Sequence, residues 1–142
     1  MTGLLYLFFI LNEVHSYKKE EKLKSRTLIN HLFNQGKSLS FFPLKVLYDF
    51  VENNGKHLQA GVTVSSRNFK KAVDRNRIKR VTRESYRLQK SSLETMLIQK
   101  KLSLILFFIY TNKDMSDFQL VHGKMHLLLQ KMEDIINRLP EK

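Results

Sequence analysis

Arginines and lysines are the residues of this sequence best placed to do chemistry, and the chemistry they suit is binding of a polyanion. Ten of them lie between Arg67 and Lys90, where the only acids are Asp74 and Glu84. Ten cations against two acids give this segment +8 of the formal net charge of +12. Charge concentrated in this way is typical of a surface that binds nucleic acid, whereas a surface built for solubility mixes both signs.

A helix over residues 72 to 90 would gather most of these cations on one face. At 100° per residue an outward arc of about 140° holds Arg75, Asn76, Lys79, Arg80, Arg83, Arg87 and Lys90. The opposite side would be lined by Ile78, Val81, Ser85 and Leu88. Three like-charge pairs at i,i+4 spacing would together cost about 1 kcal/mol in an isolated helix. A bound phosphate backbone turns that repulsion into attraction, and a solvated helix without a partner is the alternative.

Hydrolytic chemistry on the chain itself has little support. Protein nucleases use clustered carboxylates that hold metal ions, or a positioned histidine pair, and the 13 acids here are scattered. His122 and His126 have the i,i+4 spacing of a zinc-binding helix, but Gly123 stands where that motif has its glutamate. With no third ligand in the pattern, we predict no catalytic residue and no metal site.

The basic segment resembles a known family. Residues 72 to 84 read AVDRNRIKRVTRE, and this string resembles the signature A-V-x-R-N-R-x-K-R-x-x-R-E of the bacterial ribonuclease P protein component, with every fixed position matched. Lys22-Leu23, Phe33 with Gly36-Lys37, Val46-Leu47-Tyr48 and the residues 61–65 extend the likeness upstream. Ile29 departs from the pattern, because the family commonly has a phenylalanine there.

The resemblance implies a protein subunit of ribonuclease P, the ribonucleoprotein endoribonuclease that removes the 5′ leader from precursor tRNA. The implied partners are the catalytic RNA subunit and precursor tRNA, with no membrane and no evident protein partner. Cleavage would be performed by the RNA and its Mg²⁺, so this chain would hold no cofactor. A noncatalytic ribosomal or RNA-chaperone protein is the alternative, and a self-sufficient nuclease is disfavoured by the scattered acids.

The resemblance also implies site residues. Contacts with the catalytic RNA are expected at Arg75, Asn76, Arg77, Lys79, Arg80, Arg83 and Arg87. The charge is extended by Arg67, Lys70 and Lys71. For Asn76 and Arg77 the alternative is a structural role in fixing the loop and the start of the helix. Phe33 and Tyr48 match positions in a groove between the first helix and the sheet, where the leader could stack on aromatic rings; ordinary core packing is their alternative.

Hydrophobic periodicity predicts the elements that position these residues. A short helix is expected near residues 25 to 35, closed by Gly36 in the left-handed conformation. Alternation predicts strands over residues 44–50 and 58–64, with a hairpin turn at 53–56. Pro43 should interrupt any strand that runs back through Phe41, or confine it to an edge.

The second half of the chain predicts one more strand and one more long helix. Ser91-Ser92 should end the basic helix or start a short extra turn, and residues 102–110 read as a strand buried on both faces. Ser116 and Gln119 form a predicted capping box. The helix that follows should bury Phe118, Val121, Met125, Leu128, Met132, Ile135 and Leu139. This order indicates a single α+β domain.

The resemblance implies a more definite fold: a four-stranded sheet packed with helices, in which a left-handed β-α-β crossover carries the basic helix. This domain should span residues 17–142. Residues 1–16 have no counterpart in the family pattern and contain an apolar run, Leu4 to Leu11, that is too short for a bilayer span of about 20 residues. We expect a dispensable extension, with membrane anchoring as the alternative. A chain without cysteine suits the cytoplasm.

Overall fold

A four-stranded mixed sheet organises the computed structural model, which describes residues 17–52 and 55–140. Its strand order is β1-β2-β4-β3. β1 (Lys37–Phe41) pairs antiparallel with β2 (Leu44–Phe50), and β2 pairs antiparallel with β4 (Leu104–Tyr110). β4 also pairs in parallel with β3 (Leu58–Val64), so the connection between these two strands has to cross over the sheet.

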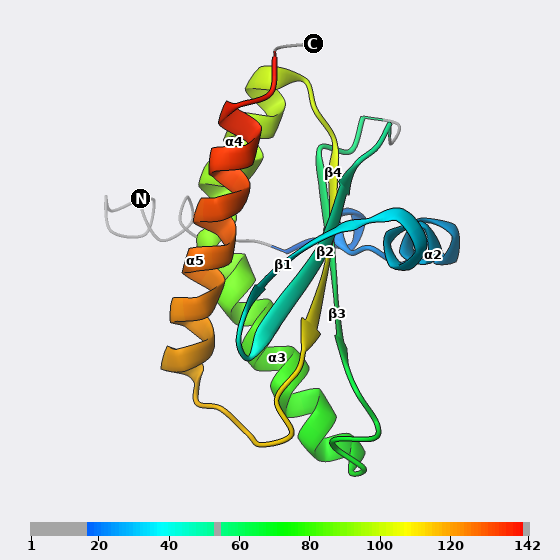
Figure 1. Ribbon diagram of the computed structural model, residues 1–142, viewed down its shortest axis with the longest axis vertical. Helices are drawn as coiled ribbons and strands as arrows, with labels where there is room; N and C mark the ends of the chain where they lie inside the picture. The colour runs from blue at the N-terminus through cyan, green and yellow to red at the C-terminus, as the bar shows by residue number, and fades with distance from the viewer. Residues whose placement is uncertain (1–16, 53–54, 141–142) are drawn as a thin grey trace, which may run out of the picture.

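Helices cover both faces of this sheet (Figure 1). α2 (Arg26–Gln35) packs on one face, and α3 (Ala72–Gln89) and α5 (Phe118–Asn137) pack on the other. α4 (Ser91–Lys100) follows α3, and a short 3-10 helix, η1 (Lys19–Glu21), lies beside β3. The predicted α+β domain is confirmed, and the basic helix α3 lies in the crossover between the parallel strands.

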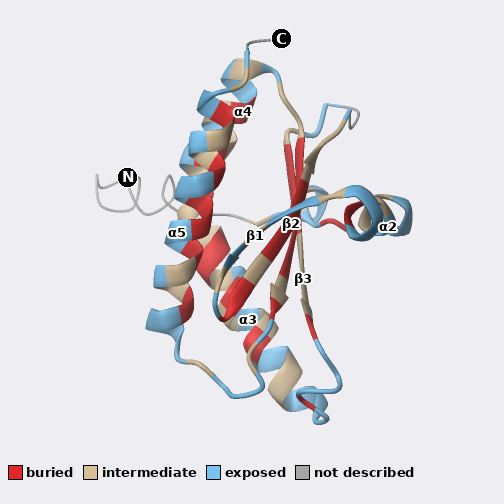
Figure 2. Ribbon diagram, viewed as in Figure 1, coloured by how far each residue is buried: buried red, intermediate tan, exposed pale blue. Residues whose placement is uncertain are grey.

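The side chains of β2 point alternately to the two faces of the sheet, and a separate core cluster lies on each face. Leu44, Val46 and Tyr48 belong to the larger cluster, which α3, α4 and α5 cover, whereas Leu47 belongs to the smaller cluster under α2. Figure 2 shows the buried residues on the strands and on the inner sides of α3 and α5. β4 is central, and all its residues except Ile109 are buried, which confirms the predicted doubly covered strand.

The predicted hairpin between residues 44–50 and 58–64 is wrong. Both strands form with the predicted bounds, but β4 lies between them, so they are not hydrogen-bonded neighbours. The almost wholly apolar β4 gains most from a central position, and its insertion separates β2 from β3. The hairpin of this sheet joins β1 to β2, with Phe41 paired to Leu44 across Phe42-Pro43. Pro43 therefore ends an edge strand, as expected.

Two helix ends differ from their predictions. Gly36 follows α2 in an extended conformation, φ −70° and ψ 154°, because the chain turns directly into β1. Glycine is required at this position for a steric reason, because a Cβ would lie 2.4 Å from the carbonyl oxygen of Leu32. Ser91 begins a helix of 10 residues rather than a short turn. The fully buried side chains of Leu93 and Leu97 explain why this helix continues.

The start of α5 is displaced by one residue from the predicted capping box. Asp117 is the N-cap, and its Oδ1 accepts a hydrogen bond of 2.8 Å from the backbone N–H of Leu120. The Ser116 hydroxyl instead accepts a hydrogen bond of 2.7 Å from the Tyr110 hydroxyl. Phe118 is exposed rather than buried, and Ile136 is more deeply buried than Ile135.

Replacement of Asp117 by alanine is expected to lower the free energy of unfolding by about 1 kcal/mol, because the first turn of α5 loses its cap. Equilibrium denaturation in urea measures the change. Asp134→Ala is the matched control, since Asp134 is an exposed residue of the same helix, and it should change stability by less than about 0.5 kcal/mol. Equal effects of the two substitutions would contradict the capping role.

A membrane-spanning helix is not found in the part of the chain that the structure describes. The apolar run from Leu4 to Leu11, for which a dispensable extension was predicted, lies outside the described residues.

Candidate nucleic-acid interface

The outer side of α3 and the loop before it form a surface that we call the basic ridge. Its members are Arg67, Lys70, Lys71, Arg77, Lys79, Arg80 and Arg83. All are exposed except Lys79, which is half-buried, and none of them forms an ion pair with a carboxylate of the described residues. Asn76 is exposed beside them. The ridge is therefore an open positive surface, and its cations are not neutralised by neighbouring acids in the described part of the chain.

The inner side of α3 is buried against the sheet and α5. Ile78, Thr82, Ser85 and Tyr86 are buried, whereas Val81 and Leu88, which were predicted to line this side, are half-buried. The hydroxyl groups of Thr82 and Ser85 donate hydrogen bonds of 2.9 and 3.0 Å to backbone carbonyls one turn earlier, which satisfies these polar groups in the core. Burial of this side presents the ridge to solvent.

Arg75 fixes the loop that leads into α3. Its Nη1 donates hydrogen bonds of 2.8 Å to the carbonyl oxygens of both Phe69 and Lys70. Phe69 is buried and packs on Tyr110 with ring centroids 6.0 Å apart. Arg75, which was predicted to contact RNA, thus has a structural role in this loop. This anchoring holds the cations of the loop next to those of the helix.

The C-terminal end of α3 departs from the predicted basic face. Arg87 binds Glu84 through Nη2–Oε1 at 2.5 Å and Nε–Oε2 at 3.1 Å, and this hydrogen bonding lowers the pKa of the Glu84 carboxyl. Lys90, predicted to point outward, is buried and pairs with Glu21 and Glu94. The prediction fails because Glu21 of η1 and Glu94 of α4 cover the Lys90 ammonium, and the periodicity of α3 does not reveal these neighbours.

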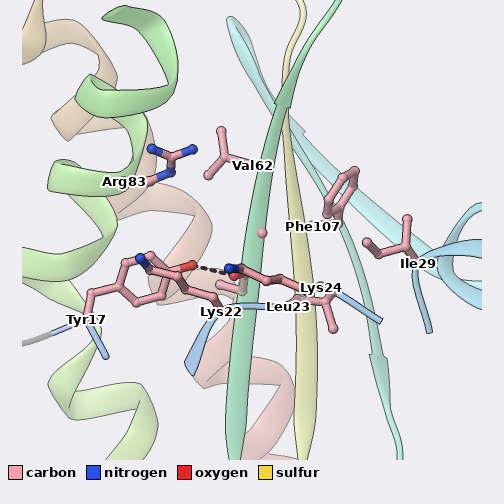
Figure 3. A pocket seen from close by; sticks show the side chains of 10 residues that line it. Tyr17, Lys22, Leu23, Lys24, Ile29, Val62, Arg83 and Phe107 are labelled. Carbon is pink, nitrogen blue, oxygen red and sulfur yellow. Dashed lines mark hydrogen bonds between the residues drawn. The ribbon is translucent and has the colours of Figure 1, made fainter. Parts of the chain in front are cut away.

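A groove of about 390 Å³ lies beside the ridge, between α2, β3 and α3. Its apolar lining comes from Leu23, Ile29, Ala60, Gly61, Val62 and Phe107. Its polar lining comes from Tyr17, Lys22, Lys24 and Arg83. Figure 3 shows the Arg83 guanidinium extending from α3 toward β3. Because Arg83 belongs to both features, the groove and the basic ridge form one continuous surface.

Close backbone contacts build the floor of the groove. A Cβ on Gly61 would lie 2.9 Å from Cδ1 of Phe107 and 3.1 Å from the Leu23 carbonyl oxygen, so glycine lets both approach β3. The Ala60 carbonyl accepts hydrogen bonds from the Leu23 N–H, at 2.9 Å, and from the Tyr17 hydroxyl. Burial raises the pKa of Tyr17 to about 12, so this hydroxyl stays a hydrogen-bond donor at alkaline pH as well as at neutral pH.

The two aromatic residues predicted for the groove lie in different places. Phe33 is 57% exposed, and its ring meets the ring of Phe107 edge to face with centroids 5.7 Å apart. It thus stands at the border of the groove. Tyr48 is 6% exposed and belongs to the core under α3, α4 and α5, on the sheet face opposite α2. Successive side chains of a strand point to opposite faces of the sheet. Leu47 faces α2, so its neighbour Tyr48 faces the other side.

Of the residues that line the groove, only Arg83 was in the predicted site; those it missed include Tyr17, Lys22, Lys24 and Phe107. The cations at 18–26 were a usable signal, because they follow directly on Tyr17. Phe107 gave no signal of its own within the apolar strand. Among the described residues, no three His, Cys, Asp or Glu side chains gather as metal ligands. His122 instead lies within 3.2 Å of the Gln89 amide nitrogen and stacks with Phe118.

The comparison with known families agrees with this arrangement of ridge and groove. A family model described as Ribonuclease P matches residues 17–133. The chain belongs to the ribonuclease P protein family. A ribonuclease P protein component from Porphyromonas gingivalis is 34% identical over 108 residues, which cover 75% of this chain and 79% of that protein. One from Chlorobium phaeobacteroides is 31% identical over 130 residues, which cover 84% and 89%.

The solved ribonuclease P protein of Thermotoga maritima shares the fold, with a TM-score of 0.60 and 26% identity over 78% of this chain and 96% of that one. The predicted family, the fold class and the subunit function are confirmed. The chain is the protein component of a ribonucleoprotein endoribonuclease that acts in tRNA 5′ maturation, in which the RNA subunit performs catalysis. The ribosomal or chaperone alternative is not favoured.

Proposed function

We propose that the basic ridge binds the catalytic RNA subunit and that the groove binds the 5′ leader of precursor tRNA. The observation that carries this proposal is the continuity of the two features at Arg83, which lines the groove and stands on the ridge. A leader that leaves the tRNA beside the catalytic RNA would meet one surface that includes both the basic ridge and the groove.

The charge and shape of the ridge support its role with the RNA subunit. Arginine and lysine side chains that lack carboxylate partners can bind RNA phosphates. They displace the counterions held by the RNA, and this release drives binding. Arg77, Arg80 and Arg83 add a planar fork that suits bidentate phosphate contacts. Arg75 stabilises the same surface through its hydrogen bonds to the loop that carries Lys70 and Lys71.

The lining of the groove supports binding of an unpaired strand. The exposed ring of Phe33, which packs edge to face on Phe107, offers a face for base stacking, and such stacking tolerates many sequences. Lys22 and Lys24 supply cations at its border for the sugar-phosphate backbone. A subunit that serves every precursor tRNA needs such tolerance, since leaders differ in sequence. Tyr48 is not part of this proposal, because it lies on the other face of the sheet.

The remaining assignments concern the cofactor, the location and the N-terminal residues. We assign Mg²⁺ to the RNA subunit, with no cofactor on this chain, in agreement with membership of a family whose catalysis is by RNA. The proposed location is the cytoplasm, where precursor tRNA is transcribed in bacteria. Residues 1–16 are proposed to be dispensable for RNA binding; the family match begins at residue 17.

Reconstitution tests the proposed function. The purified full chain should restore cleavage of a leader-bearing precursor tRNA by its cognate RNA subunit at a low Mg²⁺ concentration at which the RNA alone is inactive. Sequencing of RNA that copurifies from cells should recover the ribonuclease P RNA. A protein that activates no RNA subunit, or that prefers ribosomal RNA, would contradict the proposal.

A further inference from the structure

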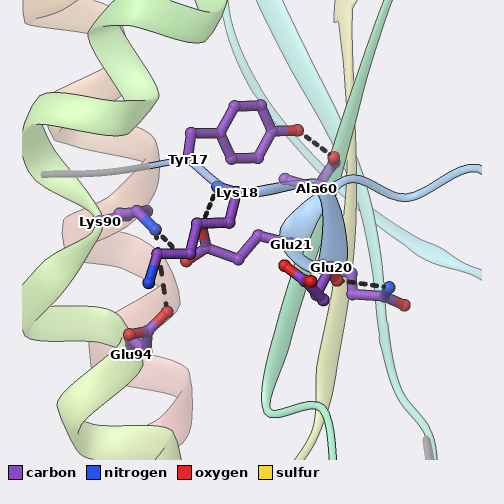
Figure 4. A network of polar contacts seen from close by, with 8 residues as sticks. Tyr17, Lys18, Glu20, Glu21, Ala60, Lys90 and Glu94 are labelled. Atoms are coloured by element: carbon purple, nitrogen blue, oxygen red, sulfur yellow. Dashed lines mark hydrogen bonds and ion pairs between the residues drawn. The ribbon is translucent and has the colours of Figure 1, made fainter. Parts of the chain in front are cut away.

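The buried lysine at the junction of α3 and α4 joins two layers of the molecule. Lys90 is 2% exposed, and its ammonium pairs with the carboxylate of Glu21 and lies 3.9 Å from that of Glu94 (Figure 4). Glu94 is on α4, one turn from Lys90, but Glu21 belongs to η1, far away in sequence. The ion pair therefore ties the N-terminal segment to the helical layer.

This N-terminal segment, residues 17–23, forms one wall of the groove. Lys22 lies over the ring of Tyr17, with its Nζ 5.7 Å from the ring centroid, and both residues line the groove. Hydrogen bonds attach the segment to β3, including one of 2.9 Å from the Gln59 amide to the Glu20 carbonyl. On its other side, Tyr17 meets Tyr86 of α3 edge to face. Lys90 adds the charged attachment on that helical side.

The ion pair restricts where η1 can lie. The Glu21 side chain is only 19% exposed, and its other oxygen accepts a hydrogen bond from the Lys18 backbone N–H. Without the ammonium, two carboxylates would remain close together in a partly buried site, which is unfavourable. Burial raises the pKa of the Glu94 carboxyl, Lys90 lowers it, and Glu21 raises it further. Glu21 would then reach water by moving, and η1 would move with it.

We propose that Lys90 is a positioning residue for leader binding: through Glu21 it holds η1 so that Tyr17 and Lys22 keep their places in the groove. The proposal rests on the proposed binding of the leader there. It assigns Lys90 a role distinct from that of the ridge cations, since its ammonium is buried and cannot meet RNA.

The test uses the full chain reconstituted with its RNA subunit. Lys90→Met is expected to reduce the preference for a leader-bearing precursor over mature tRNA by about fivefold. This is the lower end of the loss in affinity expected when one stacked base is lost. Affinity for the RNA subunit should stay unchanged, and hydrogen exchange at the Leu23 amide should become faster. Lys90→Arg should restore the preference, because the guanidinium can still pair with Glu21.

Lys100→Met is the matched control, because Lys100 ends α4, the helix that Lys90 precedes, and donates hydrogen bonds of 2.7 Å to the carbonyls of Ile136 and Leu139. It removes a hydrogen-bonded lysine that does not contact η1. An unchanged leader preference in Lys90→Met, or an equal loss in Lys100→Met, overturns the proposal. If Lys90→Met fails to fold, Glu21→Gln replaces it with the same expected loss, and a retained preference is again decisive. A wild-type holoenzyme with no leader preference would overturn both the groove and this proposal.

Discussion

Replacement of Lys79, Arg80 and Arg83 by alanine is expected to weaken binding of the catalytic RNA by two to three orders of magnitude at roughly 0.1 M salt. Each lost phosphate contact removes about 0.7–0.9 from the slope of log affinity against log salt, so the three together should flatten the slope by about 2–3. The side chains lie on the outer side of α3, and the core beneath them is formed by other residues, which leaves the fold intact.

The measurement is a titration of the isolated RNA subunit at several salt concentrations, without precursor tRNA. This choice separates the ridge from the groove, which Arg83 also lines. A triple variant of exposed cations outside the ridge, Lys113→Ala with Lys131→Ala and Arg138→Ala, is the matched control. It lowers the net charge equally. If both variants lose affinity and slope to the same degree, binding follows the overall charge, and the ridge is not the docking surface.

The basic ridge was predictable because its residues are close together in the sequence. A helical pattern with a dense basic signature specifies both an element and the face that it exposes, and α3 forms over Ala72–Gln89 as expected. The predicted outward position of Lys90 was wrong because η1 and α4 pack over it, and the periodicity of one helix does not show what other elements cover. Arg75 and Arg87 also depart from the ridge, since each is engaged by a carbonyl or carboxylate partner that periodicity does not reveal.

The groove was harder to predict because separate elements contribute to it. Ile29 comes from α2, Gly61 from β3, Phe107 from β4 and Arg83 from α3, and only the sheet topology brings them together. That topology was misread at one point, the hairpin expected between β2 and β3. Turn-forming residues indicate where a chain reverses, but they do not indicate which strand will lie beside it. The sheet face on which Tyr48 lies was also not given by the pattern of β2, because both Leu47 and Tyr48 are buried, on opposite faces.

Replacement of Phe33 by alanine should weaken binding of leader-bearing precursor tRNA by about 5- to 150-fold, the range for loss of one stacked base. Phe33 is 57% exposed, so the free protein loses little core packing when the ring is removed. The edge-to-face contact with Phe107 positions the ring at the border of the groove. Affinities of the holoenzyme for precursors with and without a leader measure the effect, which should be confined to the leader-bearing substrate.

Phe42→Ala is the matched control, because Phe42 is 63% exposed in the turn between β1 and β2 and does not line the groove. It should leave both affinities unchanged. Tyr48→Phe sharpens the test, since it keeps the buried ring and removes only the hydroxyl. If Tyr48→Phe reduced the leader preference and Phe33→Ala did not, the leader would have to lie near the opposite face of the sheet. A loss in Phe33→Ala alone places it against α2, where Ile29, Phe33 and Phe107 meet the cations of the ridge.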